Sequence, residues 1–86
     1  MDINQLIAIV KNKLKSQITI ENINIEDKSF LHKKHAGHQK DKFHLKILLK
    51  SKELKNINKI ESTKKIYKIL DEELKKHIHS IQISIE

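Results

Sequence analysis

The chain has no cysteine, no proline and no arginine, and its 86 residues include a single glycine, Gly37. Without cysteine it can form no disulfide, and any iron–sulfur cluster that it binds must take its thiolates from another molecule. A single glycine excludes the glycine-rich loops that cradle phosphate groups and the Gly-x-x-Gly clamp for RNA. The lack of arginine argues against sequence-specific recognition of guanine in DNA, because the bidentate hydrogen bonds to that base come mostly from arginine.

Aromatic residues and long apolar runs are also scarce. Phe30, Phe43 and Tyr67 are the only aromatic residues, too few for a platform on which bases stack. No apolar run approaches the roughly 18 residues of a membrane span, and the N-terminus lacks the features of a signal peptide. We therefore expect a cytoplasmic protein that does not contact a membrane. No Ser-His-Asp arrangement or paired carboxylate site is evident, so we do not expect an enzyme.

What the chain has in excess is lysine, which gives it a net charge of +7. Residues 42–68 hold nine lysines against Glu53 and Glu61. One interpretation is that these lysines only form a solvated face, and that codon bias in an AT-rich genome accounts for their number. The other is a surface that attracts an acidic protein or a polyanion. Attraction between lysine and phosphate alone would give weak, salt-sensitive binding to nucleic acid with little sequence preference.

Two helices are predicted from apolar residues that recur at spacings of three and four. The first covers residues 2–15, and its apolar residues are Ile3, Leu6, Ile7, Val10 and Leu14. The second begins at Asn58, because Asn58 and Glu61 have the spacing of a capping box, and it closes at Lys75–Lys76. Its buried stripe is expected to consist of Ile66, Ile69, Leu70 and Leu74. The acidic run at residues 71–73 is expected to face solvent.

Three strands are predicted from alternation of apolar and polar residues. The first is centred on Ile23 and Ile25, and the second covers residues 43–51. The third contains Ile81, Ile83 and Ile85. Between the first two strands, residues 28–41 form a polar loop, and loops beyond about 12 residues in a small domain are usually functional or mobile. A short turn is expected at residues 52–56.

The predicted order is helix–strand–strand–helix–strand in a single domain that spans residues 1–86. The connection between the second and third strands exceeds twenty residues, which is long enough for parallel pairing. Two amphipathic helices need one face of the sheet to bury their apolar stripes. The sequence therefore predicts an α/β (α+β) two-layer sandwich, with a three-stranded mixed sheet and the helices on one face.

Histidine is concentrated in two places. His32, His35 and His38 lie in the long loop, while His77 and His79 lie where the helical pattern gives way to the last strand. Neutral imidazole is the commonest metal ligand in proteins, but a solvated loop or a hydrogen-bonded structural histidine fits the same pattern. His79 has the alternation phase of Ile81, Ile83 and Ile85, so we expect it on the buried face at the exposed entrance of the strand.

The chain resembles the BolA family through an ordered set of short motifs. The N-terminal motifs are Asp27-Lys-Ser29-Phe-Leu-His32, His35-Ala-Gly37-His38 and His44-Leu-Lys. The C-terminal motifs are Ser51, Ile66-Tyr67-Lys-Ile-Leu70, Glu72-Glu73-Leu74 and Ile78-His79-Ser-Ile. The resemblance implies a fold similar to class II KH domains.

The resemblance also implies a function. BolA-like proteins pair with monothiol glutaredoxins and share a [2Fe–2S] cluster with them and with glutathione, in cluster trafficking or iron sensing. By matching position, the ligands here would be His79 and His32, with His35 and His38 as alternatives in the loop. No cluster is expected in the isolated protein, which would be a monomer or a weak homodimer. His44 is expected to be a structural residue or to lie at the rim of the site.

The family offers an alternative function, because some members are described as transcriptional regulators that bind DNA. In this chain the contacts would come from a lysine-rich face, with Lys59, Lys64, Lys65 and Lys68 as the candidate residues. The family's Arg-His-Arg segment is reduced here to Ser62-Thr63-Lys64, and a family glycine is replaced by Asn56. These departures weaken the inference of DNA contacts more than the inference of metal ligands.

Overall fold

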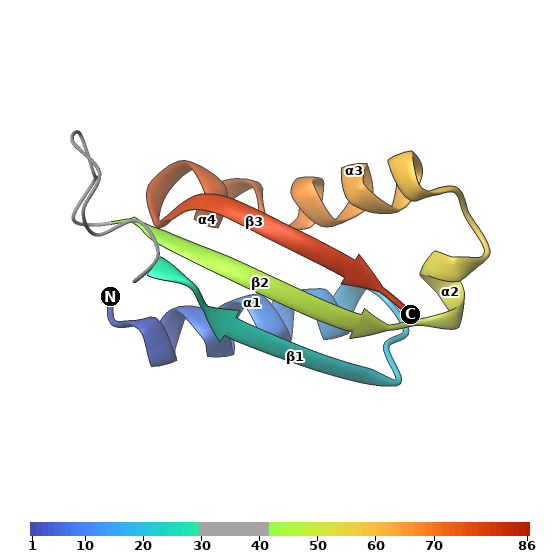
Figure 1. The fold of residues 1–86 in the computed structure, drawn as a ribbon, viewed down its shortest axis with the longest axis horizontal. Coiled ribbons are helices and arrows are strands. Elements are labelled where there is room, and N and C mark those ends of the chain that lie inside the picture. The colour runs from blue at the N-terminus through green and yellow to red at the C-terminus, as the bar shows by residue number, and fades with distance from the viewer. Residues whose placement is uncertain (30–41) are drawn as a thin grey trace.

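The computed structural model describes residues 1–29 and 42–86 (Figure 1). The elements in chain order are α1 (Ile3–Gln17), β1 (Asn22–Asp27), β2 (Phe43–Lys50), α2 (Lys52–Lys55), α3 (Lys59–Ile69), α4 (Asp71–Lys76) and β3 (Ile78–Ile85). Strand β2 lies at the centre of the sheet, antiparallel to β1 and parallel to β3. The predicted α+β fold with a three-stranded mixed sheet is confirmed.

Side-chain caps fix where the two longer helices begin. Asp2 accepts a hydrogen bond of 2.8 Å from the Gln5 backbone N–H, and the Gln5 side chain accepts one of 3.0 Å from the Asp2 N–H, which closes a capping box at α1. The Asn58 side chain accepts from the Glu61 N–H at 2.8 Å, which confirms the predicted start of α3. Each cap satisfies N–H groups that the first turn of a helix leaves unpaired.

The predicted second helix is in fact divided into two, α3 and α4, and a further short helix, α2, precedes them. Helix α2 occupies the segment expected to be a turn, and the Ser51 hydroxyl caps it by accepting from the Leu54 N–H. Helices α3 and α4 meet at Leu70, which departs from helical geometry with φ −96° and ψ 16°. Neither glycine nor proline marks this break. Leu70 is fully buried, so we attribute the break to packing at the junction.

The core lies between one face of the sheet and the helices. Across β1 and β2, Ile23 pairs with Leu49 and Ile25 with Ile47, and all four side chains are buried. The aliphatic side chains of β3 continue the same face. Helices contribute Leu6, Val10, Leu14, Leu54, Ile66 and Leu70. In Figure 1 the strands pass in front of α1, and the helices leave the near face of the sheet uncovered.

The uncovered face of the sheet, called here the open face, carries mostly polar side chains. Paired positions on it include Asn24 with Leu48 and Lys46 with Gln82. Leu48 interrupts this polar pattern. Its side chain is 36% exposed, so it is in contact with solvent. No helix in the described part of the chain is long and apolar enough to cross a membrane.

A partly buried ion pair joins the first helix to the last one. The Nζ of Lys13 lies 2.6 Å from Oε2 of Glu73, whose side chain is only 7% exposed. The expectation that residues 71–73 face solvent is therefore wrong for Glu73. The second carboxylate oxygen, Oε1, is buried without a hydrogen-bond partner among the described residues. Glu73 thus depends on Lys13 for compensation of its charge.

Candidate metal-ligand site

His79 is the extra residue of a bulge at the start of β3. The pairing steps from Phe43 with Ile78 to His44 with Ser80, so β3 has one more residue than β2 across this interval. A bulge leaves its extra residue unpaired and redirects the side chain. Ile78 is 1% exposed and joins the core, whereas His79 is exposed.

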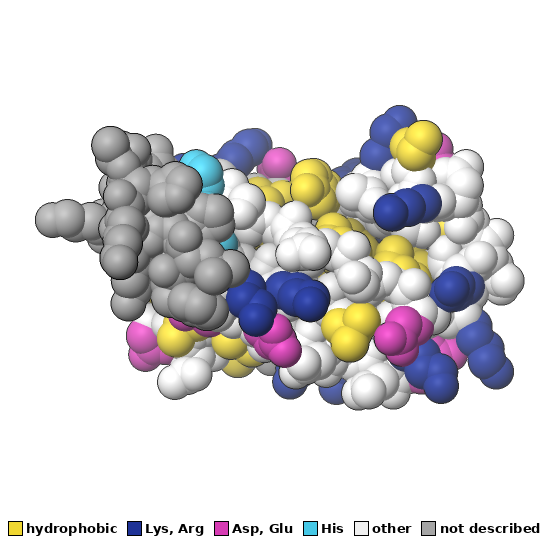
Figure 2. All heavy atoms as spheres, in the orientation of Figure 1, with side chains coloured by type: hydrophobic (Ala, Val, Ile, Leu, Met, Phe, Trp, Pro, Cys, Tyr) yellow, Lys and Arg dark blue, Asp and Glu magenta, His cyan; other side chains and the backbone are white. Residues whose placement is uncertain are grey.

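The predicted orientation of His79 is therefore wrong. The bulge interrupts the alternation, so His79 does not share the face of Ile81, Ile83 and Ile85. Its ring instead contacts the ring of His44, with 4.7 Å between centroids and 55° between planes. His44 precedes Lys46 by two residues, so it lies on the open face of the sheet. Figure 2 shows histidine side chains at the surface of this face, close to lysine side chains.

His44 is held in place by its side chain and its backbone. It is only 7% exposed, and its Nδ1 lies 2.7 Å from the Ser80 hydroxyl oxygen. The His44 N–H donates to the Ser29 hydroxyl at 3.1 Å, and its C=O accepts from the Lys28 N–H at 2.7 Å. Burial and these contacts agree with a structural role, and they give the exposed His79 ring a fixed neighbour on one side.

The described residues on either side of segment 30–41 lie at this end of the sheet. Ser29, which bonds to His44, precedes the segment, and Lys42 follows it next to Phe43. The Phe43 N–H donates to the His77 C=O at 2.9 Å, two residues before His79. Three predicted ligands, His32, His35 and His38, lie outside the described residues.

A shallow hollow of about 210 Å³ lies on the open face beside His44. Lys28, Lys46, Ser80 and Gln82 are among the residues that line it. Lys28 pairs with Glu26 at 3.0 Å. The hydrogen bond from Lys28, with a smaller contribution from the charge of Lys46, lowers the pKa of the Glu26 carboxyl. Two ammonium groups against one carboxylate make this hollow suitable for an anionic group.

His77 ends α4 and is not part of β3. Its N–H donates to the Glu73 C=O, and it caps α4. Its charge also contributes weakly to the lowered pKa of Glu72, which is due mainly to the hydrogen bond from Lys76. In residues 1–29 and 42–86, no three potential ligands converge to hold a metal ion. Any metal bound at His79 therefore requires ligands from beyond the described side chains.

The four lysines proposed for DNA do not form one stripe on α3. At about 100° per residue, Lys64, Lys65 and Lys68 fall within an arc of about 100°, while Lys59 points at least about 120° away from each of them. Lys59 lines a different hollow from Lys65 and Lys68. Lys65 is also paired with Glu53 at 2.8 Å, and that hydrogen bond is the largest cause of the lowered pKa of Glu53.

Replacing Ser80 by alanine is expected to destabilise the protein by about 1–2 kcal/mol, because buried His44 loses the hydroxyl at its Nδ1. Urea denaturation measures the change. The control is Ser84→Ala, since Ser84 lies on the same face of β3 and makes no side-chain hydrogen bond with the described residues. Equal stabilities for the two variants would contradict the assignment.

Together, these features define a small α+β protein with a mixed sheet and a histidine pair at a bulge on its last strand. A family model described as BolA-like protein matches residues 14–86, and the chain belongs to this family. The resemblance seen in the sequence motifs is thereby confirmed.

Relatives and solved structures agree with this membership. The chain is 30% identical over 77 residues to a protein from Haemophilus influenzae named "DNA-binding transcriptional regulator BolA", with 90% of this chain and 72% of the relative covered. The structure of BolA1 from Arabidopsis thaliana matches with a TM-score of 0.77 and 27% identity, over 92% of this chain and 87% of that one. BolA1 from Mus musculus, at 19% identity, matches in fold with a TM-score of 0.71, over 90% and 60%.

Proposed function

We propose that this chain is a non-enzymatic partner of a monothiol glutaredoxin and supplies histidine ligands to a [2Fe–2S] cluster that the two proteins share. The observation that carries the proposal is the position of His79. It is exposed on a bulge and its ring contacts His44, at the end of the sheet where Ser29 and Lys42 flank segment 30–41. In this proposal His79 is one ligand, and His32, His35 or His38 is the other.

The donor chemistry fits one half of a cluster site. Iron–sulfur clusters normally bind thiolates, but imidazole replaces two of them in Rieske centres. This chain has histidines and no cysteine, so the thiolates would come from the glutaredoxin and from glutathione. Because imidazole must be neutral to bind a metal, assembly of the complex should weaken as the pH falls.

The charge around the histidine pair supports a partner that carries carboxylates. Lys28 and Lys46 line the hollow beside His44, and both act on Glu26. Complementary charge speeds encounter and selects among partners more than it adds affinity. The carboxylates of glutathione, or acidic residues of the glutaredoxin, would meet these lysines as the cluster is shared.

The test is to mix the protein with a cluster-loaded monothiol glutaredoxin and to record absorption and circular dichroism in the visible range. We expect a changed spectrum, because imidazole replaces a thiolate ligand, together with a heterocomplex on size-exclusion chromatography. The protein mixed with apo-glutaredoxin is the control. An unchanged spectrum without a complex would refute the proposal.

A second candidate function is DNA-binding regulation, favoured by the name of the Haemophilus influenzae relative. Lys64 and Lys68 would contact phosphates. Each contact should make the slope of log binding constant against log salt concentration more negative by about one. Fluorescence anisotropy with duplex DNA compares the Lys64→Gln/Lys68→Gln variant with Lys11→Gln/Lys15→Gln on α1. Binding that persists at physiological salt with a sequence preference supports regulation, and binding that vanishes there excludes it.

A further inference from the structure

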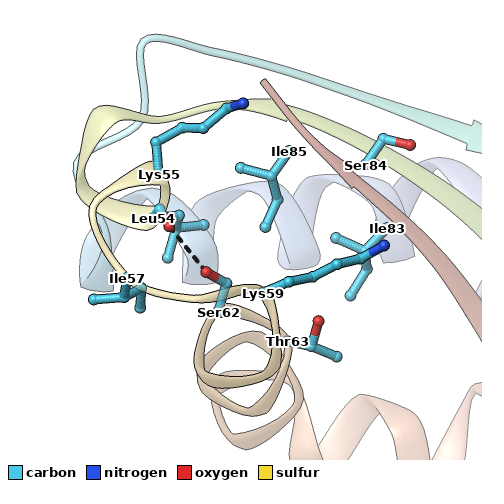
Figure 3. Close-up of a pocket in the computed structure, with 9 residues that line it drawn as sticks. All are labelled: Leu54, Lys55, Ile57, Lys59, Ser62, Thr63, Ile83, Ser84 and Ile85. Carbon is cyan, nitrogen blue, oxygen red and sulfur yellow. Dashed lines mark hydrogen bonds between the residues drawn. The ribbon is translucent and has the colours of Figure 1, made fainter.

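A groove of about 410 Å³ runs between the C-terminal half of β3 and the α2–α3 segment (Figure 3). Its apolar lining includes Leu54 and Ile57 on one side and Ile83 and Ile85 on the other. A volume of this size is within the range of small ligand pockets. The groove is at the far end of β3 from His79, about 13–20 Å away along the strand at the usual rise per residue.

The backbone of β3 presents unpaired groups to this groove. The Glu86 N–H donates to the Leu49 C=O at 2.7 Å, and the Glu86 C=O accepts from the Ser51 N–H at 3.2 Å. Because backbone groups alternate in direction along a strand, Ser84 also faces β2, whereas Ile83 and Ile85 direct their N–H and C=O groups outward. No strand in the described part of the chain pairs with this outer edge of β3.

Residues 81–85 of this edge carry none of the sequence features that usually protect an edge strand from pairing with another chain. Natural edge strands are blunted by charged residues, proline, bulges or a covering segment. Residues 81–85 contain neither a charge nor a proline, and the bulge at His79 lies at the other end of the strand. The opposite edge strand, β1, carries Glu26 and Asp27. The unprotected half of β3 is thus the part of the sheet best suited to accept a further strand.

The charges around the groove indicate the chemistry of its occupant. The residues that line it include Lys55 and Lys59 but no carboxylate. In Figure 3, Lys59 extends across the groove toward Ile83, while Lys55 stands on the other side. The Ser62 hydroxyl already donates a hydrogen bond to the Leu54 C=O at 2.9 Å, so its proton is not directed at an occupant of the groove. An apolar floor between two ammonium groups suits aliphatic side chains flanked by carboxylates.

We propose that this groove binds an extended acidic segment of a partner protein, which adds to β3 as a fourth strand. The segment would form backbone hydrogen bonds with Ile83 and Ile85. One of its aliphatic side chains would lie against Ile57, which is 41% exposed, and its carboxylates would pair with Lys55 and Lys59. This surface is separate from the histidine pair, so a partner bound here leaves His79 accessible.

The same features disfavour two other occupants. A second copy of the chain would bring two further lysines to the same edge, in a protein that already carries a net charge of +7. A nucleic acid would need aromatic or arginine contacts for its bases, and the lining residues include neither. Phosphate oxygens accept hydrogen bonds but donate none, so a nucleic acid backbone would leave the outward C=O groups of Ile83 and Ile85 unpaired, whereas an added strand pairs with both N–H and C=O groups.

The probe is a pool of short, acetylated and amidated peptides in which Glu or Asp alternates with Val, Ile or Leu. Amide chemical shifts of the isotope-labelled protein are followed as the pool is added. We expect shifts at Ile83 and Ile85. Replacing both lysines, Lys55→Glu/Lys59→Glu, should weaken binding about tenfold or more. The control, Lys64→Glu/Lys68→Glu, makes the same charge change on α3 outside the groove and should bind nearly as well as the wild type.

Backbone pairing is tested with the tightest peptide of the pool in two N-methylated forms. Each form is methylated at alternate residues, so one loses the donors that face β3 and the other only donors that face solvent. One form should fail to bind while the other binds. Equal binding of both forms, absence of shifts at Ile83 and Ile85, or shifts there caused by protein concentration or by a single-stranded oligonucleotide in place of peptide would each overturn the proposal.

Discussion

Replacing His79 by alanine is expected to abolish the spectral change on mixing with cluster-loaded glutaredoxin and to weaken the complex by at least about tenfold. Loss of a residue that merely orients a ligand already costs 10–100-fold in metal affinity, so loss of a ligand should cost no less. The residue is exposed, and substitutions at such positions usually change stability by about 0.5 kcal/mol or less. Visible circular dichroism and thermal unfolding measure the two effects.

His77→Ala is the matched control for this variant. It removes an imidazole two residues away, from a position at the end of α4 rather than against His44. If both variants change the spectrum equally, His79 is not a ligand. If neither variant changes the spectrum, neither of these two histidines is a ligand of the partner's cluster.

Replacing Lys13 by methionine is expected to destabilise the protein by about 2–3 kcal/mol. The change leaves the Glu73 carboxylate buried without its partner, and breaking a buried pair in this way costs about 3–5 kcal/mol when both groups are shielded. Lys13 keeps 37% of its side chain exposed, so we expect a smaller effect. Urea denaturation measures the free energy of unfolding.

Glu73→Gln should cost less than Lys13→Met, because Lys13 can turn to solvent while a buried carboxylate cannot. Adding Glu73→Gln to Lys13→Met should therefore recover stability. A double variant less stable than Lys13→Met alone would contradict the charge argument. The pair also sets an alkaline limit. The hydrogen bond to Glu73 raises the pKa of Lys13 above its usual 10.5, so the stability that it contributes is complete below pH 10.5 and is lost as the pH rises through the folded value.

The fold could be predicted from the sequence wherever one pattern governs a whole element. Alternation located β2, and the Asn58 cap located the start of α3. The division of the second helix at Leu70 could not be predicted, because no breaker residue is present and packing sets the break. Glu73 was misassigned for a similar reason. An acidic run is predicted to face solvent unless its ion-pair partner is known, and here that partner, Lys13, lies on another helix.

The sequence indicates His79 as a candidate ligand, which stays a prediction, but it does not indicate the geometry around that residue. His79 could be found through its resemblance to the family motif Ile78-His79-Ser-Ile. Its orientation could not, since a bulge changes the alternation phase without changing any residue that a pattern would detect. The contact between His44 and His79 follows from that bulge, and so does the face of the sheet on which they meet.

The parallel pairing of β2 with β3 has a consequence for biosynthesis. When β2 leaves the ribosome, its neighbour β1 is available, but Ile78–Ile85 has not yet been translated. Helix α1 and strand β1 are already available to β2, but the edge of β2 that pairs with β3 stays open while the three crossover helices are made. The sheet therefore cannot be completed before Ile78–Ile85 is translated, and a nascent chain stalled before Ile78 would expose the open edge of β2 to chaperones that bind aliphatic segments.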